Sequence, residues 1–395
     1  MNLEEFRSLL SSRGQEALRL AMALAPREED YLRNFQELSR KFPPDLARAS
    51  LEIAIQRRSA AVKFPFADQL YFSREALEQA SSWDVAIYRS QRLSGFERLL
   101  DLACSAGGDT LALAAATPGF EHVIGIDIDP MRLAMAQTNL AALGLQERVD
   151  LLLADLRRPL PFLNGGNTAI FFDPGRRAGG RRLHSVDHYQ PPLAVVRTWL
   201  ADVPAVSVKV SPGVDLSQLE GYDAEVEFIS LNGELKEAAL WFGLLKSSHR
   251  RATLLPGGHT LAGVAEPLPL REPGAYIYEP DPSVLRAGLV ALLGERIGAA
   301  QLDPDIAYLT ADHPVATPFA RWWAVEDWLP FSLKSLRQYL RQRSVGRVTV
   351  KKRGSPLQPE ALIHDLRLQG EQERVVFLTH LRGRPIAVVA FKVLP

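Results

Sequence analysis

The sequence predicts an α/β protein built on a doubly wound, mostly parallel sheet whose last strand is antiparallel. Three observations predict this fold class. An apolar run that ends at Asp101 is followed by a glycine pair, a helical stretch and a second apolar run that ends at Asp127, which is the order of a βαβ unit. Apolar runs and helical patterns go on alternating up to residue 210. Beyond them, Asn-Gly at 232–233 between two apolar runs predicts a hairpin, and hence a reversed strand.

The elements of this sheet follow from the pattern in chain order. The short apolar runs predict strands, and they lie at 99–101, 122–126, 149–154, 168–172 and 205–210. A helix over 109–116 is expected to start from the glycine pair. The next helix is expected over 130–143, because Pro130 suits a first helical turn and Gly144 suits the residue after a helix end.

The length of 395 residues predicts two or three domains. Residues 1–95 carry apolar side chains at helical spacing and are expected to form a helical domain. The sheet domain is expected over 96–250. Prolines gather between 256 and 282, which places a boundary near 250. The last domain, 251–395, is expected to be a smaller α/β module with helices at 283–293 and 359–368.

The bulk composition, 47% hydrophobic and 23% charged, is that of an ordinary globular protein. Cys104 is the one cysteine, so no internal disulfide can form, and the start carries acids where a secretory signal would be basic. No apolar stretch is long enough to span a bilayer. A cytoplasmic protein without membrane contact is expected. The net charge of zero hides an asymmetry, since residues 331–395 hold 13 Lys and Arg against 4 Asp and Glu, which favours a polyanionic partner.

The stretch S-A-G-G-D-T at 105–110 predicts a site for a nucleoside. Gly107 and Gly108 let backbone N–H groups and a helix N-terminus approach a ligand, and an acid about 20 residues further on can bind both ribose hydroxyls. Asp127 has this spacing. The stretch lacks the G-x-G-x-x-G spacing of pyrophosphate sites. It therefore favours a ligand without phosphate, such as S-adenosylmethionine, and the alternative is an ordinary tight turn between strand and helix.

Two motifs, D-L-A-C-S-A-G-G-D-T at 101–110 and I-G-I-D-I-D-P at 124–130, resemble those of class I S-adenosylmethionine-dependent methyltransferases. The resemblance is to the trimethylguanosine synthase type (RNA cap guanine-N2 methyltransferases), and to the bacterial subgroup with a C-terminal THUMP-like domain. It implies a Rossmann-like sheet and S-adenosylmethionine as cofactor. The cofactor residues that it implies are Asp101, Ala103, Ser105, Gly107, Gly108, Asp109, Thr110, Asp127, Ile128, Asp155 and Leu156. In that family an acid at the place of Asp155 hydrogen-bonds the adenine amino group; a turn or cap residue is the alternative.

The strand at 168–172 leads into D-P-G-R-R, which is expected to form the acceptor corner. Ligands of open α/β sheets lie beyond the carboxyl ends of the strands, so Asp173 and Pro174 should face the transferable methyl group. Related amino-methylating enzymes hold the amine with a polar side chain and a backbone carbonyl at this point, and stack the base on an aromatic ring. Here Gly175 and Arg176 replace the second proline and the aromatic, so a flat base is not guaranteed as the acceptor. Asp173 is expected to hold the acceptor by geometry, because methyl transfer is mainly a positioning problem.

Basic residues form two further candidate sites. Arg176, Arg177, Arg181 and Arg182 follow the acceptor corner and suit phosphate oxygens. In the last domain, Lys351, Lys352 and Arg353 belong to a basic strand, and the likeness to a THUMP-like domain implies RNA contact there. A solvated basic surface is the alternative for both. His184 and His188 have no metal-ligand spacing, so no metal site is expected.

These features lead to one hypothesis and two alternatives. The hypothesis is an S-adenosylmethionine-dependent methyltransferase acting on RNA, with a base amine as a plausible acceptor. The first alternative is a methyltransferase of a protein or small molecule, which the missing aromatic favours. The second is a non-catalytic RNA-binding protein on a methyltransferase scaffold. The sequence predicts neither the methylated atom nor the oligomeric state.

Overall fold

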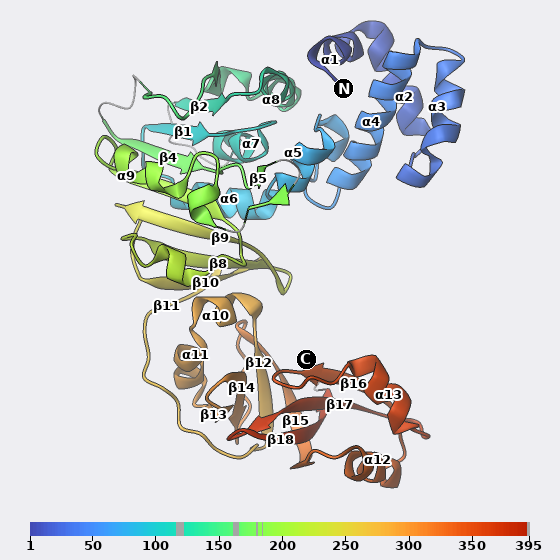
Figure 1. The fold of residues 1–395 in the computed structure, drawn as a ribbon, viewed down its shortest axis with the longest axis vertical. Helices are drawn as coiled ribbons and strands as arrows, with labels where there is room; N and C mark the ends of the chain where they lie inside the picture. The colour runs from blue at the N-terminus through green and yellow to red at the C-terminus, as the bar shows by residue number, and fades with distance from the viewer. Residues whose placement is uncertain (116–121, 161–165, 179–180, 184, 393–395) are drawn as a thin grey trace. The chain divides into compact units, whose positions relative to one another are not determined.

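The computed structural model describes residues 1–115, 122–160, 166–178, 181–183 and 185–392 (Figure 1). The chain divides into two compact units. The first consists of Met1–Glu225 with Ala238–Ser247, and the second of Val226–Glu237 with Ser248–Pro395. The two units are described separately. The division into three domains at 95 and 250 stays a prediction.

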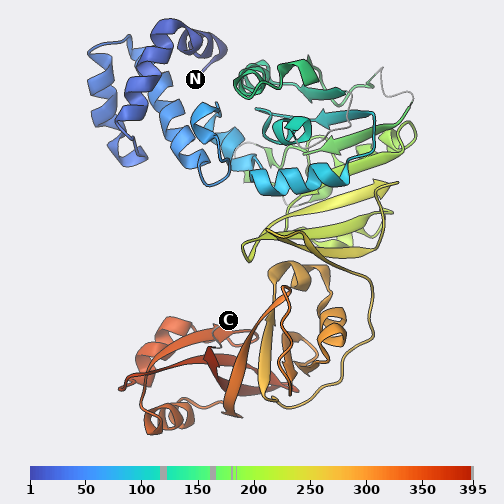
Figure 2. The ribbon, with the colours of Figure 1, turned by 180° about the vertical axis from the view of Figure 1, so that it is seen from behind.

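The chain begins with six helices in the first unit (Figures 1 and 2). They are α1 (Leu3–Leu10), α2 (Ser12–Ala23), α3 (Tyr31–Ser39), α4 (Pro44–Ala60), α5 (Arg74–Gln79) and α6 (Trp83–Arg92). Helix α4 is the centre of this group, since it contacts α1, α2 and α3. A capping box between Asn2 and Glu5 starts α1, and Ser11 and Ser73 cap α2 and α5.

The first unit contains one part of a nine-stranded sheet, with the strand order β9-β7-β4-β1-β2-β3. Its strands are β1 (Arg98–Leu102), β2 (His122–Asp127), β3 (Val149–Leu153), β4 (Thr168–Phe172), β7 (Ala205–Val210) and β9 (Glu234–Gly243). Strand β1 pairs in parallel with both β2 and β4, so the strand order reverses beside β1. Strand β9 runs antiparallel to β7, which confirms the expected reversed strand. A ligand crevice is expected where the order reverses, beyond the carboxyl ends of β1 and β4.

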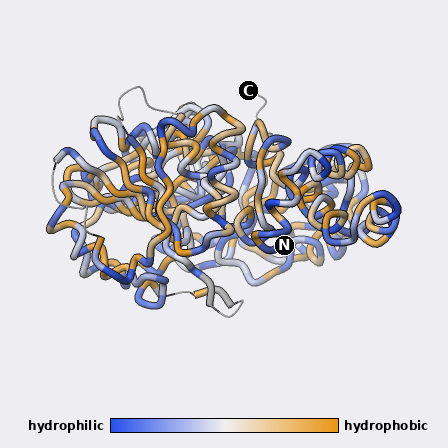
Figure 3. Tube along the Cα trace, turned by 90° about the horizontal axis from the view of Figure 1, so that it is seen from above, coloured by the Kyte–Doolittle hydropathy of each residue, from blue (hydrophilic) through white to orange (hydrophobic). Residues whose placement is uncertain are grey.

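The helices of this α/β part are α7 (Gly108–Ala115), α8 (Pro130–Ala142) and the short α9 (Val196–Trp199). Every residue of β4 and β7 is buried, which is why these strands appear in the sequence as continuous apolar runs. Along the helical parts of the chain, hydrophilic and hydrophobic stretches follow one another (Figure 3). Among the described residues, no helix combines the length and apolarity that crossing a membrane requires.

The second unit begins with β8 (Glu225–Leu231), whose turn to β9 has left-handed φ values of 55° at Asn232 and 78° at Gly233, as an Asn-Gly hairpin requires. The sequence predicts that the sheet ends with this hairpin, and that is wrong. Strand β10 (Arg250–Leu255) pairs in parallel with β8, and β11 (His259–Ala262) pairs with β10. These strands were missed because the prolines that follow them indicate a linker.

The rest of the second unit is a seven-stranded sheet with the order β13-β14-β12-β15-β18-β17-β16. Its strands are β12 (Tyr276–Pro280), β13 (Ala300–Asp303), β14 (Ile306–Ala311), β15 (Ala320–Pro330), β16 (Val345–Lys352), β17 (Gln372–Leu381) and β18 (Arg384–Lys392). The helices are α10 (Pro282–Ala287), α11 (Val290–Ile297), α12 (Leu333–Gln342) and α13 (Pro359–Leu366). The single helix expected over 283–293 is instead two, because Gly288 is left-handed with φ 72° and ends α10.

Candidate active site

A cavity of about 780 Å³ lies in the first unit at the carboxyl ends of the parallel strands. Loops after β1, β2, β3 and β4 line it, together with α5 and the segment 187–192. This is where ligands of doubly wound sheets bind. Of the predicted site residues, the cavity brings together Asp101, Ala103, Ser105, Gly108, Asp109, Asp127, Ile128, Asp155, Leu156, Asp173, Pro174 and Arg176.

The loop between β1 and α7 is the floor of this cavity. Its left-handed residues include Ala103 (φ 65°), Ser105 (φ 53°) and Gly107 (φ 81°). A Cβ on Gly107 would lie 3.1 Å from the Cβ of Ala136, so the glycine lets α8 approach the loop closely. Gly107 is therefore a packing residue and does not line the cavity. Cys104 lines the cavity but is only 5% exposed, and burial raises the pKa of its thiol, so it fills the turn as a small side chain.

Asp127 fixes the shape of the loop from the end of β2. Its Oδ2 accepts a hydrogen bond from the Ser105 backbone N–H at 2.8 Å, and its Oδ1 accepts one from Asp129 N–H at 2.9 Å. A carboxylate has about four lone-pair sites, so each oxygen can accept a further bond from a hydroxyl. The position suits the ribose role that the sequence predicts.

Asp101 lies at the end of β1 and is 1% exposed. Burial, and next the negative charge of Asp109, raise its pKa to about 8. Thr110 donates a hydrogen bond to Asp101 Oδ2 at 2.5 Å. Thr110 does not line the cavity itself, so it supports Asp101 from outside the cavity wall. The buried Oδ1 has no hydrogen-bond partner among the described residues, and neither has the buried Oγ of Ser105. Two polar atoms are thus left for a ligand.

A buried charge cluster lies behind the acceptor corner. Arg89, which is 1% exposed, pairs with Asp109, and Lys209 on β7 donates to Asp173 Oδ2 at 2.7 Å. The Lys209 ammonium lies 3.9 Å from Asp109 Oδ2 and donates to the Gln79 carbonyl at 2.9 Å. Burial raises the pKa of Asp109, but the charges of Arg89, Lys209 and Lys63, together with the hydrogen bond from Ser81, outweigh burial and leave this pKa lowered. Sequence reasoning gave Lys209 no role, although a lysine inside an apolar strand was a signal for one.

Asp155 is held differently from the other acids. Arg157 donates to it through Nε at 2.9 Å and through Nη2 at 2.7 Å, and these bonds hold the Asp155 pKa at about 2. Ile128, 58% exposed, and Leu156 lie in the same cavity wall. An apolar side chain with an ionised acceptor nearby suits a purine with an exocyclic amino group.

The acceptor corner is closed by a backbone bridge. Gly175 and Gln190 exchange two N–H···O bonds of 3.0 Å each, and a Cβ on Gly175 would lie 3.3 Å from the Gln190 carbonyl oxygen. The bridge brings the segment 187–192 to the cavity, where the exposed His188 forms part of the wall. Sequence analysis gave His188 no site role. The side chains of Arg177, Arg181 and Arg182, and residue His184, lie outside the described part of the structure.

Asn139 is a second residue that sequence reasoning missed. It is fully buried in α8. Its Oδ1 accepts from Tyr71 N–H at 2.7 Å, and its Nδ2 donates to the carbonyls of Tyr71 at 3.0 Å and Ala106 at 2.9 Å. It therefore joins the segment before α5, the glycine loop and α8. No local sequence pattern marks such a residue, because its partners lie 68 and 33 positions away.

The basic strand residues of the second unit form internal pairs. Lys351 Nζ lies 2.6 Å from Glu279 and 4.9 Å from the centre of the Trp323 ring. Arg353 lies 3.9 Å from the same carboxylate, and Lys352 reaches Gln358 at 3.5 Å. All three predicted RNA contacts thus have partners within the unit, and two of them are in ion pairs with Glu279. Trp323 is packed rather than exposed, at 7%.

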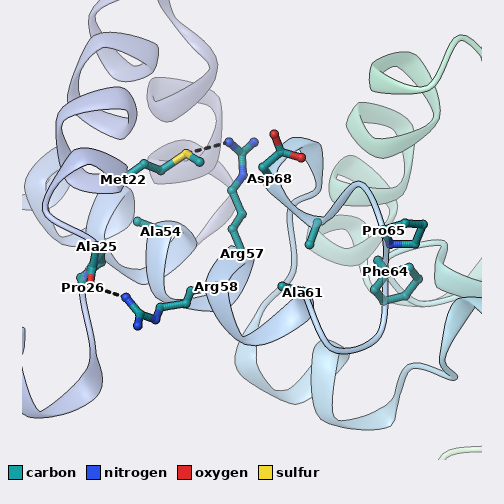
Figure 4. Close-up of a pocket in the computed structure, with 11 residues that line it drawn as sticks. Met22, Ala25, Pro26, Ala54, Arg57, Arg58, Ala61, Phe64, Pro65 and Asp68 are labelled. Atoms are coloured by element: carbon teal, nitrogen blue, oxygen red, sulfur yellow. Dashed lines mark hydrogen bonds between the residues drawn. The ribbon is translucent and has the colours of Figure 1, made fainter.

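A second cavity, of about 400 Å³, lies among the N-terminal helices (Figure 4). The charged residues that line it are Arg57, Arg58 and Asp68. The guanidinium of Arg57 donates to the carbonyls of Leu70 at 2.9 Å and Gln69 at 3.2 Å, and Arg58 donates to the Ala25 carbonyl at 2.7 Å. These arginines hold loops together. Within the described ranges, no group of three or more His, Cys, Asp or Glu could hold a metal ion.

Comparisons with known proteins agree with this geometry. The model of the RNA cap guanine-N2 methyltransferase family matches residues 96–190, that of THUMP domain-like proteins matches 320–392, and a domain of unknown function matches 2–60. A curated Mycobacterium tuberculosis relative, described as an uncharacterized S-adenosylmethionine-dependent methyltransferase, is 37% identical over 349 residues, 85% of this chain and 94% of the relative. The chain therefore belongs to the S-adenosylmethionine-dependent methyltransferases, as the sequence motifs predict.

Two further relatives extend the comparison. A crystal structure of a protein assigned as a methyltransferase from Porphyromonas gingivalis W83 has a TM-score of 0.79 at 22% identity and covers 98% of this chain and 99% of its own, so the fold is shared from end to end. The ribosomal protein L11 methyltransferase of Haemophilus ducreyi is 41% identical over 56 residues, which are 14% of this chain and 18% of the relative.

S-adenosylmethionine is the cofactor of this family, and the cavity fits it. The wall contains the carboxylates of Asp109, Asp127, Asp155 and Asp173, which favour a sulfonium and an ammonium group over a pyrophosphate, and Asp101, which its raised pKa of about 8 keeps mostly protonated at neutral pH. The orphaned oxygens of Asp101 and Ser105 can take polar groups of the amino-acid part. The assignment of each side chain to one cofactor group stays a prediction.

Proposed function

We propose that this methyltransferase acts on RNA and methylates an exocyclic amine of a base. The observation that supports the proposal best is that two stretches of this one chain match families whose names point to RNA. A stretch similar to RNA cap guanine-N2 methyltransferases contains the acidic-proline corner, and a THUMP domain-like stretch follows in the part of the chain with the excess of positive charge.

In this proposal the cofactor supplies an electrophilic methyl group. The new N–C bond forms as the S–C bond breaks, the electron pair stays on sulfur, and the amine later gives one proton to water. Asp173 and the Pro174 carbonyl accept hydrogen bonds from the amine and aim its lone pair. The corner itself lacks the expected aromatic. The 187–192 segment brings two rings to the same cavity, the buried Tyr189 and the exposed His188. We infer that His188 is in position to contact the base.

The test is transfer of a labelled methyl group to total RNA from a strain that lacks the protein, followed by mass spectrometry of the nucleosides. The proposal predicts one N-methylated nucleoside that wild-type protein makes and Asp173→Ala does not. Label in an O-methylated or C-methylated nucleoside would overturn the amine assignment.

A methyltransferase of proteins is the second candidate, and the short match to a ribosomal protein methyltransferase favours it. Incubation of the same cell extract, with and without ribonuclease treatment, separates the two. Label that remains in protein after RNA is digested would support the second candidate and contradict the first.

A further inference from the structure

Lys209 is the one strand lysine that reaches the acceptor corner of the first unit in the described structure. It lies on β7, next to β4, and is 3% exposed. Its ammonium has three oxygen neighbours: Asp173 Oδ2 at 2.7 Å, the Gln79 carbonyl at 2.9 Å and Asp109 Oδ2 at 3.9 Å. An ammonium has three N–H donors, and two of them form these hydrogen bonds to Asp173 and Gln79, while Asp109 lies within ion-pair distance.

The contacts show on which group Lys209 acts. Among the described residues, Asp173 lines the cavity and Lys209 does not. An acceptor would therefore meet Asp173, with Lys209 behind it. No hydrogen bond within the described residues involves Asp173 Oδ1, so the lysine fixes one carboxylate oxygen and leaves the other for a ligand.

The surrounding charges explain why Asp173 needs a cation. Asp101 faces it from β1 and Asp109 from α7, and carboxylates that lie this close oppose one another's ionisation. Three cations face Asp109: Lys209 itself, Arg89 from α6 and Lys63 from the segment before α5. Arg89 pairs with Asp109, and Lys63 donates to the carbonyls of Leu77 and Ala80 at 2.7 Å. In the described contacts, Lys209 is the cation hydrogen-bonded to Asp173.

We propose that Lys209 is a positioning residue that keeps Asp173 as a fixed carboxylate, with one oxygen held by the lysine and the other presented to the methyl acceptor. This inference rests on the proposed function, because it assigns Asp173 to the acceptor. A protonated Asp173 would direct an O–H donor at the amine, whose N–H groups need a hydrogen-bond acceptor there. The enzyme without Lys209 should therefore need a higher pH to work.

The test is the pH dependence of kcat for wild type, Lys209→Met, Lys209→Arg and the control Lys246→Met, whose half-buried lysine pairs with Asp223. For Lys209→Met we expect the acidic limb of the pH profile of kcat to shift to higher pH by about one unit or more, because a close ion pair is lost. The KM for the cofactor should stay unchanged. Lys209→Arg should keep the wild-type limb, and so should the control. An unmoved limb in a folded Lys209→Met would overturn the proposal.

A double-mutant cycle tests whether the lysine acts through the aspartate. In an Asp173→Asn background, Lys209→Met should cause no further loss of kcat, since its target is already neutral. Equal losses in both backgrounds would overturn the proposal. This double variant also removes both charges of the pair, which keeps the test open if the single variant does not fold.

A carboxyl NMR titration separates this inference from the proposed function. With ¹³C-labelled aspartate, and Asp173→Asn to assign the signal, Asp173 should titrate at higher pH in Lys209→Met or Lys209→Gln than in wild type. If wild type transfers no methyl group to RNA at any pH, the proposed function fails, and the titration still decides the role of Lys209.

Discussion

At the scale of residues, the candidate site divides into side chains that the sequence could predict and side chains that it could not. Acids that follow apolar runs could be predicted, because strand ends meet at one edge of a parallel sheet, and the cavity contains Asp101, Asp127 and Asp173 together. The roles of Lys209 and Asn139 could not be predicted, because they depend on partners far away in the chain; the apolar strand around Lys209 marks this lysine as unusual but does not show its partners. A buried polar residue has a role only through the groups that satisfy it.

Asp127 gives the first prediction at this scale. Asp127→Ala removes the acceptor of two backbone N–H bonds and the carboxylate that we place at the ribose. We expect the affinity for S-adenosylhomocysteine, measured by calorimetry, to fall by at least about tenfold, or roughly 1.4 kcal/mol. Asp150→Ala, on the neighbouring strand and exposed, is the matched control. Equal affinities of both variants and wild type would refute the ribose assignment.

Asp101 gives the second, through its pKa of about 8. The folded protein holds this proton more tightly than the unfolded chain, so Asp101 contributes stability below its unfolded pKa of about 4, and that contribution is lost as pH rises towards 8. Asp101→Asn cannot lose a proton. In thermal melts, the Tm of Asp101→Asn minus that of wild type should therefore rise between pH 5 and 8 and then level off. A difference that does not change with pH would contradict the assigned burial of the charge.

At the scale of elements, the strands that the sequence predicts best are those buried on both faces. The predicted 205–210 is observed unchanged as β7, and 168–172 as β4. Strands β10 and β11 were missed, because β11 is a short element among exposed residues and both adjoin Pro and Gly. Pairing with β8 determines β10, and such pairing between distant segments leaves no local pattern.

The prediction at this scale concerns the junction of α8, the glycine loop and the segment before α5. Asn139→Ala leaves buried Tyr71 and Ala106 groups without their partners. We expect a loss of about 3 kcal/mol in the free energy of unfolding, with weaker cofactor binding, because the loop loses its support.

Denaturant unfolding followed by fluorescence measures this loss, and Gln137→Ala on the exposed side of the same helix is the control. The control should stay within about 0.5 kcal/mol of wild type. If the two variants were equally stable, Asn139 would not be the clamp that the contacts indicate.

At the scale of the whole molecule, the charge asymmetry was visible in the sequence, but its distribution was not. The sequence predicts a basic face that includes Lys351 and Arg353, whereas both are engaged with Glu279. Exposed basic side chains of the second unit, such as Lys334 and Arg384, are better candidates for phosphate contact. Which basic residues are free depends on tertiary pairing, so sequence alone could not separate them.

The corresponding prediction concerns the salt dependence of RNA affinity. The affinity for bulk tRNA should fall steeply with salt, and Lys334→Ala with Arg384→Ala should reduce the slope of log K against log salt by about 0.7 to 0.9 per lost contact. Lys41→Ala, an exposed lysine of the N-terminal helices, should leave the slope unchanged. A flat salt dependence of wild type would argue against a phosphate-binding surface.

The most direct measurement of the central claim is a crystal structure of the protein with S-adenosylhomocysteine at saturating concentration. The claim predicts the ribose beside Asp127, the adenine between Ile128 and Asp155, and the sulfur directed towards Asp173. An empty cavity, or a ligand bound at any other place in the chain, would contradict it.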